Sequence, residues 1–211
     1  MWPAFWTYGI QEEWPLAGEI DIIEAINGMT NNQVALHTPP GCYQAQNPGQ
    51  TGVTLEGDCS KDQGCIVAET KPNSYGPGFA AAGGGVYAIQ IAASGIYSWF
   101  WSVCFRYFQI FMVFNGLQRP DIPDNVKLST STSSIDTGAW GLPSSAYPAS
   151  ACNITQFFPP QNLVLLTTLC GVWCVLFFAT ILPLYFVSYA TLGLEYQIFI
   201  ERPARRLPIL V

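Results

Sequence analysis

Three carboxyl groups stand close together in residues 19–24, which read EIDIIE. Retaining hydrolysis of a glycosidic bond needs two carboxyl groups about 5–5.5 Å apart, one as nucleophile and one as acid/base. Glu19 and Asp21 are two residues apart, so a strand would place them on one face. A regular strand would turn Glu24 to the other face, but one extra residue at Ile22-Ile23, a β-bulge, would return it to the acidic face. The segment therefore predicts a bulged strand able to do hydrolytic chemistry.

The outer carboxylates would then be roughly 13 Å apart between backbones, a gap that two Glu side chains leaning inward over Asp21 would close. Like charges this close raise one pKa, as a general acid near neutral pH requires. We expect Asp21 to hydrogen-bond the nucleophile and to help set the protonation pattern. The competing interpretation is a solvated strand face, which the spacing alone favours. A short helix is disfavoured by the β-branched residues.

Aromatic side chains near the acidic segment would suit sugars, whose apolar C–H faces stack on aromatic rings. The candidates are Trp2, Trp6 and Trp14 before the segment, and Trp99 and Trp101 on one face of a later predicted strand. For each of them, packing in the core is the alternative. His37 would contact the substrate or the acid/base residue, with a structural hydrogen bond as the alternative.

Alternation of apolar and polar residues predicts the strands that would position these groups. Isoleucines favour a strand over residues 19–26, and residues 33–38 alternate again with Val34 and Leu36 on one face. Strands 86–92 and 97–102, joined by a turn at Ser94-Gly95, form a predicted hairpin. Residues 163–168 are typical of a core strand. Residues 39–80 are rich in Gly, Pro, Asn and Asp and predict a long loop region.

Composition limits the partners. Only 10% of the residues are charged, 14% are aromatic, and the net charge is −6 with eight Lys and Arg. Nucleic acid is excluded, because phosphate binding needs a basic surface, and a neutral polysaccharide suits the chain better. No metal site is expected, since His37 is the sole histidine and no CxxC pair is present.

The cysteines and one glycosylation sequence bear on the compartment. Three of the seven Cys fall in the segment from Cys42 to Cys65, which predicts a disulfide-stapled loop in an oxidising compartment. Because the total of seven is odd, at least one thiol is left unpaired. Asn153-Ile154-Thr155 is a glycosylation sequon, useful only in a secreted protein. No signal peptide is visible after Met1, so the chain is either cytosolic or lacks its true N-terminus.

Two apolar segments break the pattern. Residues 103–114 are almost wholly apolar without alternation. Residues 174–194 are nearly uncharged over about the length that a bilayer needs and are followed by three Arg, so they are a transmembrane candidate with a kink at Pro183. The other interpretation is that neither segment belongs to the natural protein.

Several short motifs together resemble the fungal laminarinase-type endo-1,3(4)-β-glucanases of glycoside hydrolase family 16. The motifs are residues 2–6 (WPAFW), 14–15 (WP), 18–24 (GEIDIIE), 32–33 (NQ), 36–38 (LHT), 41–42 (GC), 83–88 (GGGVYA), 99–102 (WFWS), 121–123 (DIP) and 170–173 (CGVW). The acidic motif within its Trp and His context is specific, whereas the others are individually weak. The resemblance extends from residue 2 to about residue 173.

The resemblance implies an all-β, concanavalin-like β-sandwich of the jelly-roll kind, with substrate in a concave cleft. It implies Glu19 as nucleophile, Glu24 as acid/base and Asp21 as the partner of the nucleophile, with no cofactor. The substrate contacts would be Trp2, Trp6, Trp14, Gln33, His37, Trp99 and Trp101. The partner would be β-glucan, acted on by a monomer in the extracellular space or cell wall.

The chain also departs from the family pattern. The acidic strand begins at residue 19, so the N-terminal strands of the sandwich and a secretion signal are expected to be missing. Residues 103–118 interrupt the match as an insertion, and residues 174–211 form an apolar tail after a partial domain at 1–173. We interpret both apolar pieces as translated introns of an incomplete gene model, with the transmembrane interpretation of the tail as the alternative.

Three functions fit these observations. The first is an endo-β-glucanase that cleaves internal β-1,3 or mixed β-1,3/1,4 linkages with retention. The second is an inactive or membrane-anchored glucan-binding cell-wall protein held by residues 174–194. The third is a transglycosylase of the same fold, which would use the same carboxyl pair but exclude water from the second step.

Overall fold

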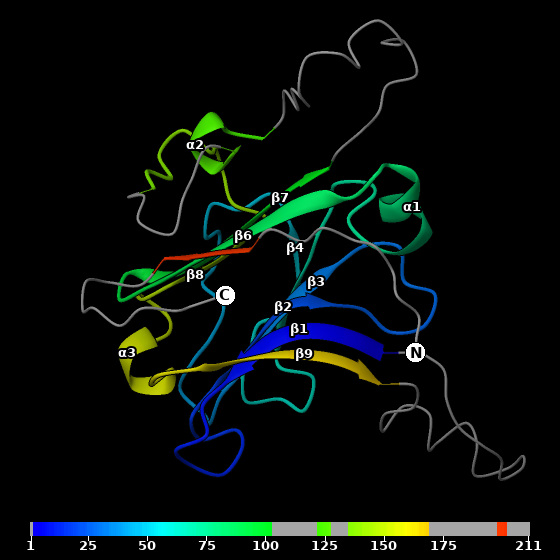
Figure 1. Ribbon diagram of the computed structural model, residues 1–211. Coiled ribbons are helices and arrows are strands. Elements are labelled where there is room, and N and C mark those ends of the chain that lie inside the picture. Colours follow the sequence, from blue (N-terminus) through cyan, green and yellow to red (C-terminus); the bar gives the residue numbers. More distant parts are fainter. Residues whose placement is uncertain (1, 103–121, 128–134, 169–197, 202–211) are drawn as a thin grey trace, which may run out of the picture.

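Two β-sheets packed face to face make up the part of the chain that the computed structural model describes, namely residues 2–102, 122–127, 135–168 and 198–201 (Figure 1). The first sheet has six strands in the order β4-β5-β3-β2-β1-β9, and the second has four in the order β10-β6-β7-β8. Among the described strands, every pairing except that of β10 with β6 is antiparallel. This is the expected all-β sandwich.

The first sheet is built from β1 (Trp2–Tyr8), β2 (Glu19–Glu24), β3 (Gln33–His37), β4 (Val53–Glu56), β5 (Cys65–Ala68) and β9 (Asn162–Thr168). The second is built from β6 (Gly85–Ala92), β7 (Gly95–Ser102), β8 (Ser145–Pro148) and β10 (Ile198–Glu201). The described residues also form three short helices: α1 (Gly76–Ala81), α2 (Asp124–Lys127) and α3 (Ile154–Phe157).

The main core lies between the sheets, because every second residue of each strand faces the opposite sheet. From the first sheet, Ile20 and Leu36 enter this core, and from the second, Ile96, Phe100 and Tyr147. The Tyr147 hydroxyl reaches the Val34 carbonyl at 3.0 Å, which links the two sheets across the core. The predicted orientation of residues 33–38 is confirmed, since Val34 and Leu36 are buried.

The hairpin prediction is confirmed and the prediction of a long loop is wrong. Strands β6 and β7 pair from Gly85 with Ser102 to Ala92 with Gly95. By contrast, residues 39–80 contain β4, β5 and α1. Strands β4 and β5 have only four residues each, between turns rich in Gly and Pro, so the turn signals outweigh the strand signals in the sequence.

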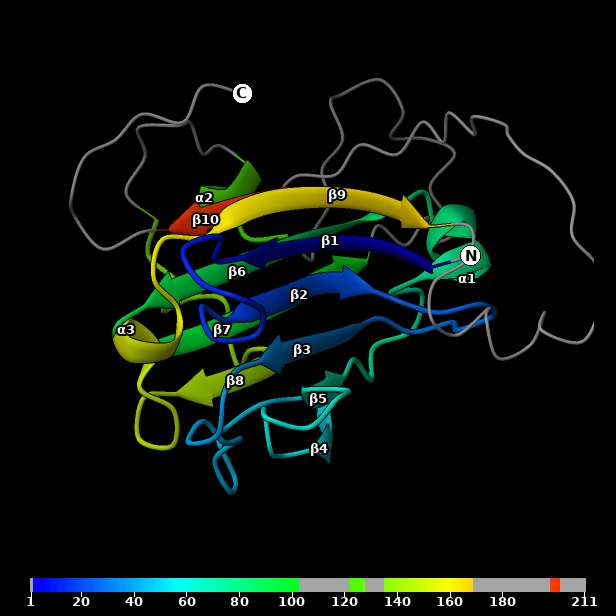
Figure 2. The same cartoon turned by 90° about the horizontal axis from the view of Figure 1, so that it is seen from below.

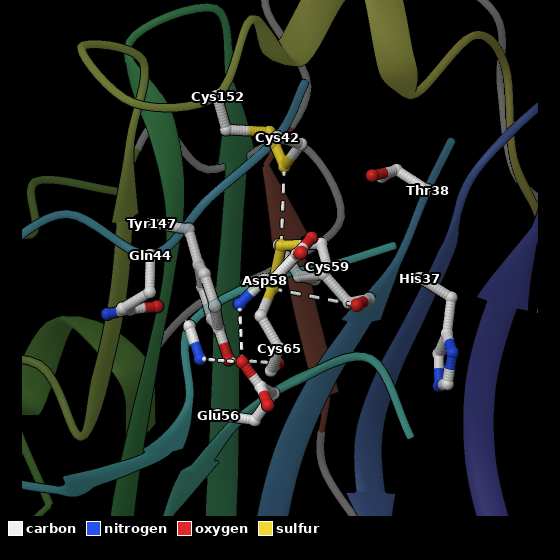
Figure 3. Close-up of a disulfide and its surroundings, with 12 residues drawn as sticks. His37, Thr38, Cys42, Gln44, Glu56, Asp58, Cys59, Cys65, Tyr147 and Cys152 are labelled. Carbon is white, nitrogen blue, oxygen red and sulfur yellow. Dashed lines mark hydrogen bonds between the residues drawn. A yellow bond between two sulfur atoms is a disulfide. The ribbon is translucent and has the colours of Figure 1, made fainter. Parts of the chain in front are cut away.

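Two disulfides close the loops beside the first sheet (Figure 3). Cys59 pairs with Cys65 across six residues, as a local staple, whereas Cys42 pairs with Cys152 at a sequence separation of 110. The stapled loop is therefore confirmed for the Cys59 pair and wrong for Cys42, whose partner lies far outside the segment. The two disulfides are in contact, with the Sγ atoms of Cys42 and Cys59 3.4 Å apart.

Strand β9 forms the outer edge of the first sheet and pairs along its whole length with β1 (Figure 2). The predicted strand at 163–168 is confirmed, but its assignment to the core is wrong. Leu165 is 78% exposed, and Leu163 and Leu166 are also exposed. An apolar run of this length is typical of a buried strand, but among the described residues β9 lies at the edge of the first sheet, where these leucines are exposed.

The remaining sequence predictions fall largely outside the described residues. The predicted insertion at 103–118 and the apolar segment 174–194 lie there, as do Cys104, Cys170 and Cys174. Of the 174–211 tail, residues 198–201 are described, as the backbone of β10 in parallel pairing with β6. Within the described residues, no helix combines the length and apolar composition needed to cross a bilayer.

Candidate active site

The predicted β-bulge is present in β2. On β3, Ala35 stands opposite Asp21 and Gln33 stands opposite Glu24, so Val34 alone faces the two residues Ile22 and Ile23. The pairing with β1 shifts at the same place, between Phe5 and Trp6. Both isoleucines are buried in the core between the sheets. The bulge therefore turns two successive apolar residues inward and returns Glu24 to the face that carries Glu19 and Asp21.

Asn32 holds this bulge from the start of β3. Its Oδ1 accepts the backbone N–H of Glu24 at 2.9 Å, and its Nδ2 donates to the Ile22 carbonyl at 3.0 Å. The side chain is only 1% exposed. Sequence reasoning singled out Asn32-Gln33 only as a weak motif and assigned Asn32 no role. The available signal was a polar residue directly before an alternating strand.

Glu24 is held by two side-chain donors from the neighbouring strands. The Trp2 indole N–H on β1 donates to Oε1 at 2.8 Å, and the Gln33 amide on β3 donates to Oε2 at 3.2 Å. The structure thus brings two predicted substrate-contact residues directly to the predicted acid/base. Both contacts fix the direction in which the carboxyl group points.

Glu19 lies at the start of β2 beneath the loop that precedes it. The Trp14 indole N–H donates to its Oε2 at 2.7 Å. Burial, followed by the charge of Asp21, raises the pKa of Glu19 to about 8, while His37 and the Trp14 hydrogen bond act in the opposite direction. A carboxyl group with this pKa exchanges protons near neutral pH.

Asp21 lies between the two glutamates and is 2% exposed. Its Oδ2 is 3.3 Å from His37 Nε2. Burial, reinforced by the charge of Glu24, raises the pKa of Asp21 well above its usual value. Because Asp21 is the more deeply buried of the Glu19–Asp21 pair, desolvation favours keeping the proton on Asp21 and the charge on Glu19. The role of Asp21 as partner of the nucleophile stays a prediction.

His37 closes the site from β3. Its ring centroid is 5.7 Å from that of Trp14, and burial lowers the pKa of its imidazole. Among the described residues, the ligand atoms of Glu19, Asp21 and His37 lie within 4.8 Å of one another. We assign the three side chains to acid–base chemistry, because a buried carboxyl that keeps its proton is a poor cation ligand. That the protein needs no metal stays a prediction.

The remaining tryptophans divide between the two sheets. Trp6 lies on β1 opposite Asp21 and shares a face with Trp2, with its ring 5.1 Å from that of Tyr8. Trp99 and Trp101 do not reach the site. They are buried on the outer face of the second sheet and pack edge-on against Trp140. The period of two on β7 shows that the pair shares a face, but Phe100 is the residue that faces the core.

Asn153, the predicted glycosylation residue, is exposed and caps α3. Its Oδ1 accepts the Gln156 backbone N–H at 3.3 Å and the Thr155 hydroxyl at 3.0 Å. The amide nitrogen, to which a glycan would be attached, has no partner among the described residues and remains open to solvent.

An antiparallel sandwich with three carboxyl groups on a bulged strand defines the class: a carbohydrate-active fold with the parts of a glycosidase. Comparison with known proteins agrees. The model of the XgeA-like catalytic domain of glycoside hydrolase family 16 matches residues 1–180. The chain belongs to glycoside hydrolase family 16.

Two curated relatives each match most of the chain. A probable glycosidase of Schizosaccharomyces pombe is 34% identical over 179 residues, which is 82% of this chain and 38% of that protein. An endo-1,3(4)-β-glucanase of Arthroderma benhamiae is 33% identical over 180 residues, covering 82% of this chain and 35% of that protein. The chain therefore spans little more than a third of these relatives.

Solved structures show the same fold. An elongating family 16 β-1,3-glucosyltransferase has a TM-score of 0.66 at 34% identity, covering 89% of this chain and 57% of that one. Laminarinase 16A from Phanerochaete chrysosporium, solved with β-glucans in its donor and acceptor sites, has a TM-score of 0.66 at 30% identity. That match covers 82% of this chain and 54% of the laminarinase.

Proposed function

We propose that this protein hydrolyses β-1,3 or mixed β-1,3/1,4 linkages inside glucans, with retention at the anomeric carbon. The observation that carries the proposal is the bulge at Ile22-Ile23, which sets Glu19, Asp21 and Glu24 on one face of β2. A solvated strand face would not need the bulge, nor would it bury Asp21.

The first half of the reaction forms a covalent intermediate. The Glu19 carboxylate attacks the anomeric carbon, and Glu24 donates its proton to the glycosidic oxygen, so the bond to the leaving sugar breaks as the glycosyl ester forms. Asp21 keeps its proton and donates a hydrogen bond to Glu19, which orients the attacking carboxylate. The Trp2 and Gln33 contacts keep Glu24 directed toward the leaving group.

The second half releases the sugar. Glu24, now a carboxylate, takes a proton from water, and the hydroxide oxygen attacks the anomeric carbon while Glu19 departs. Glu24 regains its proton and Glu19 regains its charge, so the site returns to its starting state. Each carboxyl group thus plays a role that its position on β2 allows.

The choice of glucan is supported by the relatives. The Arthroderma relative is named an endo-1,3(4)-β-glucanase, and the laminarinase structure holds β-glucan oligosaccharides. Trp6 and the exposed ring of Trp14 offer aromatic faces on the site side of the first sheet, where pyranose rings would stack. Trp99 and Trp101 offer none there.

Azide rescue separates the two roles. The chain should release reducing ends from laminarin, and Glu19→Ala and Glu24→Ala should each lower the rate by about 10³-fold or more. With an aryl laminari-oligosaccharide whose leaving group needs no general acid, azide should then restore turnover, giving an α-glycosyl azide with Glu19→Ala and a β-glycosyl azide with Glu24→Ala. An inverted product from the unmodified chain, or rescue with the opposite anomers, would refute the assignment.

Transglycosylation is a second candidate, favoured by the likeness to the elongating β-1,3-glucosyltransferase. The same carboxyl pair would serve, with a sugar hydroxyl replacing water in the second step. Product lengths decide between them: hydrolysis shortens laminari-oligosaccharides, whereas transfer yields chains longer than the starting material. Binding of laminarin without either product would indicate a glucan-binding protein.

We further propose that the protein works outside the cell or in the cell wall. Two disulfides support this, because such bonds persist in oxidising compartments. The exposed Asn153 would then carry a glycan. Secretion from a fungal host with an endoglycosidase-sensitive mass, lost in Asn153→Gln, tests both points. Monomeric state stays a prediction, checked by light scattering.

A further inference from the structure

The two outer carboxyl groups of the site each receive one indole N–H, but from different kinds of segment. Trp2, which binds Glu24, belongs to β1, where its backbone pairs with β9. Trp14, which binds Glu19, lies in the loop between β1 and β2 and is 54% exposed. Glu24 has a second side-chain donor in Gln33, whereas among the described residues Trp14 supplies the sole indole donor to Glu19.

We propose that Trp14 is a positioning residue for the nucleophile: its indole N–H binds Oε2 of Glu19, favours the charged form of the carboxyl group and leaves the other oxygen to attack. This role is separate from sugar stacking, because stacking uses the ring face and the hydrogen bond uses the ring edge. The proposal rests on Glu19 being the nucleophile.

The need for such a donor follows from what surrounds Glu19. On its own strand, β2, Glu19 shares a face with Asp21 and, further along, with Glu24. In the strand pairing, its partner on β3 is His37 and its partner on β1 is Tyr8. Glu12 and Glu13 on its own loop are exposed. Burial and Asp21 both favour the protonated form of Glu19, which cannot attack. The Trp14 hydrogen bond and His37 are the two contacts that favour the charged form.

Loop geometry holds Trp14 in place. The loop is closed at its base by the Gly9 N–H, which donates to the Gly18 carbonyl at 3.1 Å, and turns through the Leu16 N–H to the Glu13 carbonyl at 2.8 Å. On its other side, the ring contacts His37. A sugar that stacks on Trp14 would therefore contact the same ring that donates to Glu19. Sugar binding would in this way be coupled to the orientation of the nucleophile.

Trp6 provides a matched control for the proposal. It is also a tryptophan on the site face, opposite Asp21 in the β1–β2 pairing, yet its indole N–H has no hydrogen-bond partner among the described residues. Trp6→Phe and Trp14→Phe therefore make the same chemical change at the same site. Only the second removes a hydrogen bond to Glu19.

The test is a carboxyl titration of the full chain by ¹³C NMR, without substrate. Trp14→Phe should raise the pKa of Glu19 by about one unit, since a hydrogen bond to a charged group is worth about 1.5 kcal/mol or more. Trp6→Phe should leave that pKa unchanged. Equal titration of Glu19 in Trp14→Phe and the unmodified chain, or the same shift in both variants, would overturn the proposal.

Two further measurements complete the test. In the unmodified chain, the Trp14 indole ¹H–¹⁵N resonance should titrate with the Glu19 midpoint, a readout that needs no folded variant; a flat resonance contradicts the contact. In kinetics on laminarin, Trp14→Phe should move the acidic limb of kcat/KM upward by the same unit. A change in KM without a shift in the acidic limb of the kcat/KM profile would mean that Trp14 only stacks on the sugar. Because the titration needs no turnover, its result is independent of whether the chain hydrolyses glucan.

Discussion

The side-chain amide of Asn32 spans the bulge next to Glu24, accepting the Glu24 backbone N–H at 2.9 Å and donating to the Ile22 carbonyl at 3.0 Å. A bulge leaves the ladder locally unpaired, and here one buried amide satisfies both of the unpaired backbone groups. The direction of the acid/base carboxyl therefore depends on a residue that takes no part in the chemistry.

Asn32→Leu should remove both hydrogen bonds that hold the bulge while keeping a side chain of similar size. Two buried backbone groups would lose their partners, which costs about 2–4 kcal/mol in unfolding free energy. Urea denaturation followed by far-UV circular dichroism measures this loss. Gln46→Leu, at an exposed loop position, should change the midpoint little. An Asn32→Leu protein as stable as the unmodified chain would contradict the account.

Glu19→Gln should stabilise the fold above neutral pH. The pKa of Glu19 is raised by burial, and then by Asp21, from 4.5 to about 8, so the folded state binds a proton that the unfolded state has released between these values. Stability contributed by Glu19 is therefore complete below about pH 4.5 and is lost as pH rises toward 8. Replacing the acid with an amide removes this loss.

Thermal melts at pH 4 and pH 8 check this sign. The difference in Tm between Glu19→Gln and the unmodified chain should be near zero at pH 4 and positive at pH 8. At pH 8 it should correspond to a gain of roughly 1–3 kcal/mol in unfolding free energy. Glu13→Gln, an exposed change on the neighbouring loop, is the control and should show no such pH dependence. A variant less stable at pH 8 than at pH 4, relative to the unmodified chain, would reverse the assignment.

The two disulfides should differ in their contribution to stability. Cys42–Cys152 closes a loop with a separation of 110 residues, against six for Cys59–Cys65. Since loop-closure entropy grows with loop length, losing the long link should cost about 4–5 kcal/mol and losing the short one about 2 kcal/mol. Denaturation of Cys42→Ser/Cys152→Ser and Cys59→Ser/Cys65→Ser pairs gives the comparison. Equal losses would point to strain or packing as the main effect.

Trp99 and Trp101 should matter for stability and not for substrate. Trp101→Leu removes an edge contact with Trp140 in the outer cluster of the second sheet and should cost about 2–4 kcal/mol. KM for laminarin, measured well below the melting temperature, should stay unchanged. Trp6→Leu, on the site face, should raise KM instead. A raised KM in Trp101→Leu would restore the sequence prediction that this residue contacts glucan.

Sequence alone predicted the parts of the site whose side-chain pattern has one consistent solution. Three acids in β2 can share a face only with a bulge, and Ile22-Ile23 was the place for it. Trp99 and Trp101 show the limit: alternation tells which residues share a face but not which face meets the core. Strands β4 and β5 were missed because four-residue strands leave too short a pattern, and Asn32 because its partners are backbone atoms brought close only by the bulge.

Strand β9 should be a site of self-association. Its seven residues, NLVLLTT, carry no charge and no proline, its pairing with β1 has no bulge, and its other edge is unpaired by any described strand. Edge strands of natural proteins usually carry charges, prolines or bulges, which prevent edge-to-edge pairing. Leu165, opposite Phe5 and 78% exposed, is the most exposed apolar side chain of the strand.

Leu165→Lys should therefore lower aggregation without lowering stability, because the charged group replaces an apolar side chain that is already in water. We expect a change of Tm within about 2–4 °C, and a slower rise of light scattering at high protein concentration. Leu36→Lys, a fully buried change on β3, should unfold the protein and gives the contrast. If Leu165→Lys destabilised the fold as strongly as a core substitution, Leu165 would have to be covered, and β9 would be an interior strand of the working protein.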